Sequence, residues 1–322
     1  MSDLQGARVC VTGGAGFVGS HVVDFLVREP VREVVVFDNF IRGQRANLQG
    51  AMSSERVRVV HGDITRPKEL TAAVATADFV IHLAALWLLE CVEEPRAAVE
   101  VNVCGTFNVI EACCAAETKK LVFSSPASVY GDAVEVPMTE AHPFNNRTLY
   151  GATKIAGEQL LQALHYAHGL PFAALRYMNV YGPRQDDRGA YTSVVTKVLD
   201  RIDRGLPPVI FGDGTATYDF VYVEDVARAN VLALTNGTPA GFYNIGSGVA
   251  TTVNELVREL LDLTGSAQCP EYRPQAQVFV QRRIGSTDLA EQELGFRAVV
   301  PLRTGLEKLI AWREREKAAL AR

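Results

Sequence analysis

Tyr150 and Lys154 stand four residues apart in the segment LYGATKIAGEQ. Side chains with this spacing lie on the same face of a helix. A tyrosine hydroxyl ordinarily titrates at about pH 10, and a neighbouring ammonium group lowers that pKa because it favours the phenolate. The pair therefore predicts a general base that removes a proton from a substrate hydroxyl near neutral pH.

A second segment, VTGGAGFVGSH, has the spacing G-x-x-G-x-x-G, with glycines at Gly13, Gly16 and Gly19. Glycines let the backbone turn tightly and approach a pyrophosphate, and the helix that follows offers N–H donors. The next apolar run ends at Asp38, whose carboxylate can accept hydrogen bonds from ribose hydroxyls and would repel a 2′-phosphate. The two segments together predict an NAD site.

Two arginines just downstream, Arg42 and Arg45, oppose the preference for NAD, since they could bind the 2′-phosphate of NADP. The alternative is that both are solvated charges of a loop.

The elements around these residues alternate between short apolar runs and longer amphipathic ones. The strand candidates are ARVCVT, EVVVFD, VRVVHG, DFVIHLA, KKLVFSS and FAALRYM, and the helical patterns lie near residues 17–28, 67–76, 94–117 and 148–168. Valine-rich runs without polar alternation indicate strands buried on both faces. We expect an α/β fold with a doubly wound parallel sheet and a smaller, loop-rich α/β lobe after residue 178.

Composition excludes several classes of function. The 322 residues carry a formal net charge of -5, which gives no electrostatic basis for binding nucleic acid or an anionic membrane. The longest apolar run, FVIHLAALWLL, is too short to span a bilayer, and the N-terminus lacks the pattern of a signal peptide. The six cysteines lack metal-ligand spacing. We expect a cytoplasmic protein without a metal.

As a set, the motifs resemble the extended short-chain dehydrogenase/reductase family, and within it the nucleotide-sugar 4-epimerases. The resemblance rests on motifs in the family's order, which are TGGAGFVGSH, DN, GDI, HLAA, VNVCGT, SSPASVYG, YGATK, LRYMNVYGPRQ, FVYVEDVA and YNIGSG. It implies a Rossmann domain for NAD over residues 1–178, with a return segment near 215–245. It also implies a nucleotide-sugar-binding lobe over 179–322 and a homodimer formed by the helices at 94–117 and 148–168.

The resemblance also implies where each ligand lies. Around the cofactor it places Phe17 and Val18 at the pyrophosphate, Asp38 and Asn39 at the adenosine ribose, Asp63 and Ile64 at the adenine, Leu83, Ala84 and Ala85 along the middle, and Asn102, Tyr150, Lys154 and Met178 at the nicotinamide half. Around the diphosphate of the sugar nucleotide it places Asn179, Val209, Phe211 and Arg273.

Three positions depart from the family pattern. Pro126 stands where relatives carry a Ser or Thr that bonds the reacting sugar oxygen. Tyr218 stands where many carry an Arg that grips the diphosphate, and the replacement charge comes from Arg184, Arg273, Arg282 or Arg283. Trp87 stands near a position where galactose epimerases often carry Lys, and it reshapes the sugar-side wall.

Proline supplies neither a side-chain hydroxyl nor a backbone N–H. In an extended chain alternate residues share a face, so Ser124 and Ser128 point the same way as Pro126 and Ser125 points away. Ser128 is therefore the expected replacement and a third catalytic residue, with Ser125 the alternative if a turn breaks the alternation. Relatives that dehydrate their substrates carry Thr-Asp-Glu where this chain has Pro-Ala-Ser, so elimination is disfavoured.

The sequence thus predicts an NAD-dependent epimerase that inverts C4 of a nucleotide-diphosphate sugar, with a UDP-sugar as substrate, through a 4-keto intermediate. Two alternatives remain open: another nucleotide-sugar oxidoreductase that exchanges its cofactor, and a catalytically weak protein that binds NAD or a sugar nucleotide because Pro126 removes a needed group.

Overall fold

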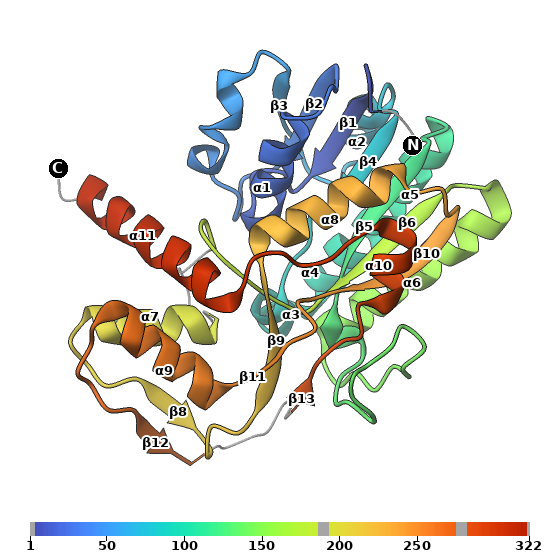
Figure 1. Cartoon of the computed structure of the whole chain (residues 1–322). Coiled ribbons are helices and arrows are strands. Elements are labelled where there is room, and N and C mark those ends of the chain that lie inside the picture. Colours follow the sequence, from blue (N-terminus) through green and yellow to red (C-terminus); the bar gives the residue numbers. More distant parts are fainter. Residues whose placement is uncertain (1–3, 186–192, 275–281, 321–322) are drawn as a thin grey trace.

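The computed structural model of the chain describes residues 4–185, 193–274 and 282–320. Its main layer is a seven-stranded sheet in the order β10-β6-β5-β4-β1-β2-β3, with neighbouring strands paired in parallel (Figure 1). These strands are β1 (Arg8–Thr12), β2 (Glu33–Asp38), β3 (Val57–His61), β4 (Phe79–His82), β5 (Lys120–Pro126), β6 (Phe172–Tyr177) and β10 (Ala240–Ile245). The order runs outward from β1 in both directions, so the expected doubly wound α/β fold is confirmed.

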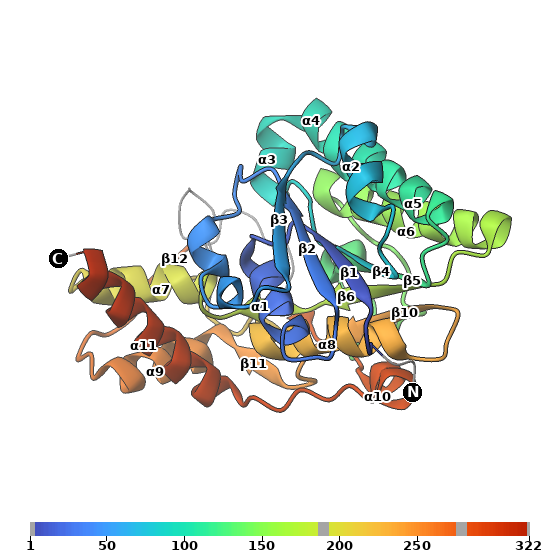
Figure 2. The same cartoon turned by 90° about the horizontal axis from the view of Figure 1, so that it is seen from above.

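Helices cover both faces of this sheet (Figure 2). Helices α1 (Phe17–Leu26) and α8 (Val223–Thr235) pack on one face, and α2 (Pro67–Val74), α5 (Thr106–Ala115) and α6 (Leu149–His168) pack on the other. Each strand contributes side chains to the hydrophobic cores on both faces of the sheet, because successive side chains alternate between the faces. In β1, Val9 and Val11 join the core beneath α1 and α8, whereas Cys10 joins the opposite core.

The helix expected near residues 94–117 consists of three consecutive segments. These are α4 (Pro95–Val99), a π-helical turn (Glu100–Gly105) and α5. The run Pro95–Ala115 is long and apolar enough to cross a membrane by length and composition, but 44% of its apolar stretch is buried inside the protein. It packs against α2 and α6, so it serves as part of the helical layer on the sheet.

A smaller lobe with a core of its own lies beside the carboxyl ends of the central strands (Figure 1). Its helices are α7 (Val194–Asp203), α9 (Val253–Thr264) and α11 (Leu302–Leu320), and its strands are β7 (Asn179–Tyr181), β8 (Val209–Phe211), β9 (Thr217–Tyr222), β11 (Ala250–Thr252), β12 (Glu271–Arg273) and β13 (Arg282–Arg283). The remaining elements are α3 (Leu88–Glu93), α10 (Asp288–Leu294) and the 3₁₀ turns η1 (Arg45–Leu48), η2 (Ala51–Ser53) and η4 (Ala127–Val129).

Candidate active site

The turn between β1 and α1 leaves no room for side chains. Gly13 has a φ of 71°, and a Cβ there would lie 2.6 Å from the backbone nitrogen of Ala84. A Cβ on Gly19 would overlap the carbonyl oxygen of Gly13. Helix α1 begins at Phe17, and no side chain caps it at Gly16. Bare backbone in front of an uncapped helix start fits the pyrophosphate of a dinucleotide, with Phe17 and Val18 in the first helical turn.

Polar side chains gather where β2 and β3 end. The Asp38 carboxylate accepts hydrogen bonds from the backbone N–H groups of Ala15 (2.9 Å) and Phe40 (2.8 Å), and burial raises its pKa. Asn39 donates to Asp63 at 2.9 Å. Burial alone would raise the pKa of Asp63, but hydrogen bonds from Thr65 and Asn39 hold it below its ordinary value. The structure therefore brings Asp38, Asn39 and Asp63 together, as an adenosine site requires.

The segment after β4 lies against the glycine turn. Leu83, Ala84 and Ala85 follow this strand directly, and Ala84 is the residue that Gly13 approaches. Leu86, the residue after Ala85, is held by the side-chain amide of Asn102 on the π-helical turn. The amide oxygen of Asn102 accepts from the Leu86 N–H at 2.7 Å, and the amide nitrogen donates to the Leu86 carbonyl at 2.8 Å. A π-helical turn is often found at a functional site, and this one holds the segment that follows β4 beside the glycine turn.

Two further expected cofactor residues are buried in the core. Ile64 is buried and would contact a Cβ placed on Gly105 of the π-helical turn, at 2.8 Å. Met178 is buried directly after β6, and its backbone N–H donates to the Ile245 carbonyl at 2.9 Å. Both are packing residues here, and their contact with the cofactor stays a prediction.

Tyr150 and Lys154 occupy the first turns of α6, whose start is capped by the Thr148 side chain accepting from the Gly151 N–H at 3.0 Å. Lys154 is 2% exposed and donates to the Ser124 carbonyl at 3.0 Å. Burial lowers the pKa of Lys154 to about 8. The lysine is therefore close to its titration point at neutral pH.

The expected lowering of the Tyr150 pKa by Lys154 is wrong for the polypeptide alone. Burial raises the pKa of Tyr150, Cys91 and Glu90 add to the rise, and Arg42 is the cation that opposes it. Lys154 points instead to the backbone of β5. Because a bound nicotinamide ring is cationic, the phenolate gains further stabilisation only when the cofactor is present.

Ser128 carries a buried hydroxyl without a hydrogen-bond partner among residues 4–185, 193–274 and 282–320. An unsatisfied buried hydroxyl costs free energy, so such groups often await a ligand. The carbonyl of Ser128 would lie 2.9 Å from a Cβ on Gly151, the neighbour of Tyr150. The orphaned hydroxyl therefore lies on the turn that packs against the start of α6.

The alternation argument for this stretch fails after Pro126, because β5 ends there and residues 127–129 form a 3₁₀ turn. Ser125, the alternative hydroxyl, donates a 2.6 Å hydrogen bond to the buried carboxylate of Glu158. Its role is in the core of the domain, and it does not replace the missing hydroxyl of Pro126.

The smaller lobe supplies the residues expected at the diphosphate. Asn179 donates to the Asp219 carbonyl at 3.2 Å, and Val209 and Phe211 lie on β8, with Phe211 57% exposed. Arg273 pairs in register with Phe211 across β8 and β12, and its guanidinium contacts Glu271 at 2.8 Å.

Of the four candidate arginines, Arg184 is engaged elsewhere, in a 2.7 Å ion pair with Asp24 of α1. Arg283 lies directly beside Tyr218, because β13 and β9 pair in parallel with these two residues in register. Arg282 is the exposed neighbour, opposite Thr217. The structure thus places a guanidinium next to the position where family members carry theirs.

Sequence reasoning missed a contact between the loop after β2 and the start of α3. Arg42 stacks 4.7 Å over the Trp87 ring and forms a 3.1 Å ion pair with Glu90, whose other oxygen accepts from the Trp87 N–H at 3.0 Å. Arg42 is therefore not a solvated loop charge, whereas Arg45 is exposed and stacks on Phe40 at 4.6 Å. No local periodicity signals the Arg42 contact, since Arg42 and Glu90 lie 48 residues apart.

Residues 9–246 match the model of the NAD dependent epimerase/dehydratase family. The chain belongs to this family. It is 36% identical over 311 residues to a putative UDP-glucose 4-epimerase of Methanocaldococcus jannaschii, covering 94% of this chain and 97% of that protein. The family places the chain among the extended short-chain dehydrogenase/reductases, as the motifs predicted, and makes it an NAD-dependent enzyme of the epimerase/dehydratase type.

Solved structures agree with this assignment. A UDP-glucose 4-epimerase of Thermotoga maritima with UDP-glucose has a TM-score of 0.89 at 35% identity, covering 96% of this chain and 99% of that chain. A UDP-glucose 4-epimerase of Thermus thermophilus in complex with NAD has a TM-score of 0.84 at 33% identity, covering 95% and 99%. The glycine cradle, the uncapped helix start and the carboxylates at β2 and β3 fit the same cofactor in this chain.

Proposed function

We propose that the protein is a nucleotide-sugar 4-epimerase that acts on a UDP-sugar and keeps its NAD between turnovers. The observation that carries this proposal is the buried hydroxyl of Ser128, which has no hydrogen-bond partner within the described part of the chain and lies on the turn that packs against the Tyr150 helix. One phenol and one hydroxyl beside a dinucleotide cradle are what reversible oxidation of a sugar alcohol needs. Relatives named UDP-glucose 4-epimerase support the same choice.

Each residue of the site has one task in this reaction. Tyr150 removes the proton of the 4-hydroxyl and later returns it, and Ser128 donates a hydrogen bond to the reacting oxygen. Lys154 ties the end of β5 to α6 and adds positive charge there. The chemistry that NAD supplies when bound is acceptance of hydride from C4 and its return to the other face of the 4-keto sugar. Residues Gly13 to Val18, Asp38, Asn39 and Asp63 would hold it.

The turn itself argues against dehydration within the same family. Elimination of a hydroxyl needs an acid and a base in addition to the tyrosine. Pro126, Ala127 and Ser128 supply no carboxylate at the positions where the dehydratases carry theirs. Hydride transfer away from C4 and back inverts that carbon without such a pair.

We assign cofactor binding to residues 1–178 with the return segment near 215–245, and nucleotide-sugar binding to 179–322. Asn179, Val209 and Phe211 border the nucleotide, and Arg283 beside Tyr218 supplies charge to the diphosphate. A guanidinium binds two phosphate oxygens at once, which is why arginine suits this position.

We further propose a cytoplasmic homodimer formed through α5 and α6. Val99, Phe107 and Tyr166 are 44%, 39% and 79% exposed on the outer side of this helical layer. A second copy presenting the same helices would cover them, because a two-fold interface is self-complementary. Light scattering that gives a monomer mass at micromolar concentration would refute the dimer.

The test uses purified protein without added NAD, incubated separately with UDP-glucose, UDP-N-acetylglucosamine and UDP-glucuronate and followed by NMR. Appearance of the 4-epimer from any of the three supports the proposal and names the sugar, and Tyr150→Phe should abolish it. If NAD is bound and the sugar nucleotides raise Tm without any product, the protein is a binding protein and the proposal fails.

A further inference from the structure

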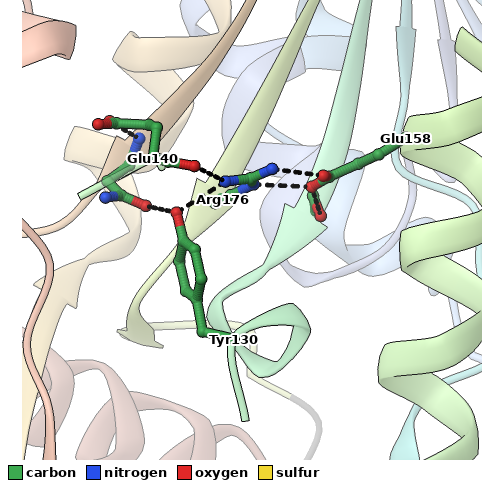
Figure 3. A network of polar contacts seen from close by, with 6 residues as sticks. Tyr130, Glu140, Glu158 and Arg176 are labelled. Atoms are coloured by element: carbon green, nitrogen blue, oxygen red, sulfur yellow. Dashed lines mark hydrogen bonds and ion pairs between the residues drawn. The ribbon is translucent and has the colours of Figure 1, made fainter. Parts of the chain in front are cut away.

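A buried ion pair lies at the centre of a polar network of the Rossmann domain (Figure 3). Arg176 of β6 and Glu158 of α6 are 3% and 0% exposed. Two parallel hydrogen bonds join them, from Nε to Oε1 at 2.9 Å and from Nη2 to Oε2 at 2.6 Å. Replacing a buried ion pair by well-packed apolar residues is often neutral for stability, so stability alone does not account for it.

The pair holds the turn that carries Pro126 and Ser128 from both ends. Before the turn, the Ser125 hydroxyl donates to Glu158 Oε1 at 2.6 Å. After the turn, Arg176 Nη1 donates to the Tyr130 hydroxyl at 2.9 Å, and this hydroxyl donates to Asn244 Oδ1 at 2.6 Å. The four residues between these anchors, 126–129, therefore have little freedom to move relative to the ion pair.

The same pair holds the helix that carries the catalytic tyrosine. Tyr150, Lys154 and Glu158 follow one another at four-residue spacing, so they share the face of α6 that meets β5. Lys154 bonds to the Ser124 carbonyl and Glu158 to the Ser125 side chain, which joins helix and strand end at two successive turns. The distance between the turn and the helix is thus fixed by these contacts.

We propose that Arg176 and Glu158 are positioning residues, which set the place of the Ser128 hydroxyl relative to the Tyr150 hydroxyl. The inference rests on the proposed function, because that function gives the two hydroxyls a shared oxygen to hold. With proline at 126, Ser128 is the one hydroxyl of the turn that joins Tyr150 at the reacting oxygen. The placement of the Ser128 hydroxyl therefore matters more. A misplacement of about 1 Å can cost on the order of 100-fold in rate.

Two small changes remove one anchor of the turn each and leave both residues of the ion pair in place. Ser125→Ala frees the start of the turn and Tyr130→Phe frees its end. We expect each variant to lower kcat by about 10-fold, with KM nearly unchanged, since the hydroxyls act in the chemical step. The acid limb of the kcat–pH profile should stay in place, because the Ser128 hydroxyl bonds the reacting sugar oxygen and not the Tyr150 hydroxyl.

Lys120→Met is the matched control for lost stability. Lys120 is also a buried cation, 3% exposed, and it bonds to the Asn236 and Thr238 carbonyls at 3.0 and 2.6 Å. It begins the same strand, roughly 20 Å from Pro126 along β5. This variant should lower Tm while leaving kcat and the pH profile as in the wild type. A purely structural role of the network predicts that Ser125→Ala and Tyr130→Phe behave like this control, and that result would overturn the proposal.

Crystal structures of the NAD-loaded proteins separate this inference from the epimerase assignment, because they give the distance between the Ser128 and Tyr150 hydroxyl oxygens without any turnover. A longer distance, or a turn over residues 126–129 in more than one position, in Ser125→Ala and Tyr130→Phe supports the positioning role even if no UDP-sugar is epimerised. An active wild type whose distance is unchanged in both variants refutes the positioning role and leaves the epimerase assignment standing.

Discussion

The side-chain nitrogen of Lys154 donates a 3.0 Å hydrogen bond to the backbone carbonyl of Ser124 and lies 4.8 Å from the centre of the Phe123 ring. No carboxylate forms an ion pair with Lys154 in the part of the chain that the structure describes. An ammonium group held only by a carbonyl and an aromatic face is costly to bury. This is why its pKa falls to about 8.

The low pKa predicts a pH-dependent stability of the protein without cofactor. Between pH 8 and 10.5 the unfolded chain binds more protons at Lys154 than the folded chain, so the free energy of unfolding rises with pH there. The total rise from this group is about 3 kcal/mol. Lys154→Met removes it, so the stability of the variant relative to wild type should fall by about this amount across the window. Urea unfolding measures it, and a constant difference would contradict the low pKa.

His82 makes the free energy of unfolding depend on pH in the acidic range. It is fully buried, with Nδ1 2.7 Å from the Thr12 hydroxyl and Nε2 3.0 Å from that of Thr106. Burial, with a smaller contribution from Lys154, lowers its pKa to about 3. The unfolded chain therefore binds more protons at this histidine from pH 6.5 down to about 3, and stability is lost as the pH falls through that range.

We expect His82→Gln to lose less stability on acidification than the wild type does, by about 1.4 kcal/mol for each pH unit inside the window. Equal acid sensitivity of His82→Gln and wild type would show that His82 does not titrate as its burial implies.

The sequence predicted six of the seven strands of the sheet, because each of these is a short apolar run, but it did not predict the edge strand β10. It also placed Asp38 and the glycine turn, since motif and element are adjacent in the chain. It did not predict the route of the chain after Pro126, where a 3₁₀ turn replaces the strand and ends the alternation. Whether a strand stops at a given residue depends on tertiary contacts, here those of Ser125 and Tyr130 with the Arg176–Glu158 pair.

Contacts between segments that are distant in the sequence were not predicted either. The four-residue spacing places Glu158 on the same helix face as Lys154, but nothing in the sequence indicates that its partner is Arg176 on β6. The ion pair between Arg42 and Glu90 joins the loop after β2 to helix α3, which follows β4. Only the strand order shows that β2 and β4 flank β1 and its glycine turn.

That flanking position gives a prediction about cofactor retention. Because β1 lies between β2 and β4, the contact of Arg42 with Glu90 and Trp87 joins the segments that follow these two strands, on either side of the proposed NAD site. Glu90→Gln removes the charge that holds Arg42 while keeping the amide oxygen that accepts from Trp87. We expect NAD to leave this variant about 10-fold faster, since a partly buried charge pair contributes on the order of 1 kcal/mol. Release is measured by dilution into a scavenging dehydrogenase.

Glu259→Gln controls for the loss of an ion pair as such. Glu259 of α9 pairs with Arg303 of α11 at 2.6 Å in the smaller lobe, and its side chain is as exposed as that of Glu90. It should release NAD at the wild-type rate. If Glu90→Gln matches it, the bridge does not contribute to retention.

The replacement of a hydroxyl by Pro126 makes a prediction that a double-mutant cycle can test. Pro126 ends β5 in register with Tyr177, and serine fits the same extended backbone at φ -95° and ψ 154°. Pro126→Ser should raise kcat, because a second hydroxyl then reaches the reacting oxygen. Ser128→Ala alone should lower kcat by about 100-fold, as expected for the loss of a hydrogen bond made in the chemical step.

The double variant, with both Pro126→Ser and Ser128→Ala, shows whether the hydroxyls at positions 126 and 128 bond the same reacting oxygen. If they do, Ser128→Ala costs much less in the Pro126→Ser background than in the wild type, and the two effects are not additive. Additive effects would show that the hydroxyls act on different groups. A lower kcat in Pro126→Ser, with unchanged Tm and NAD content, would show that this turn is adapted to proline and that the missing hydroxyl does not limit the reaction.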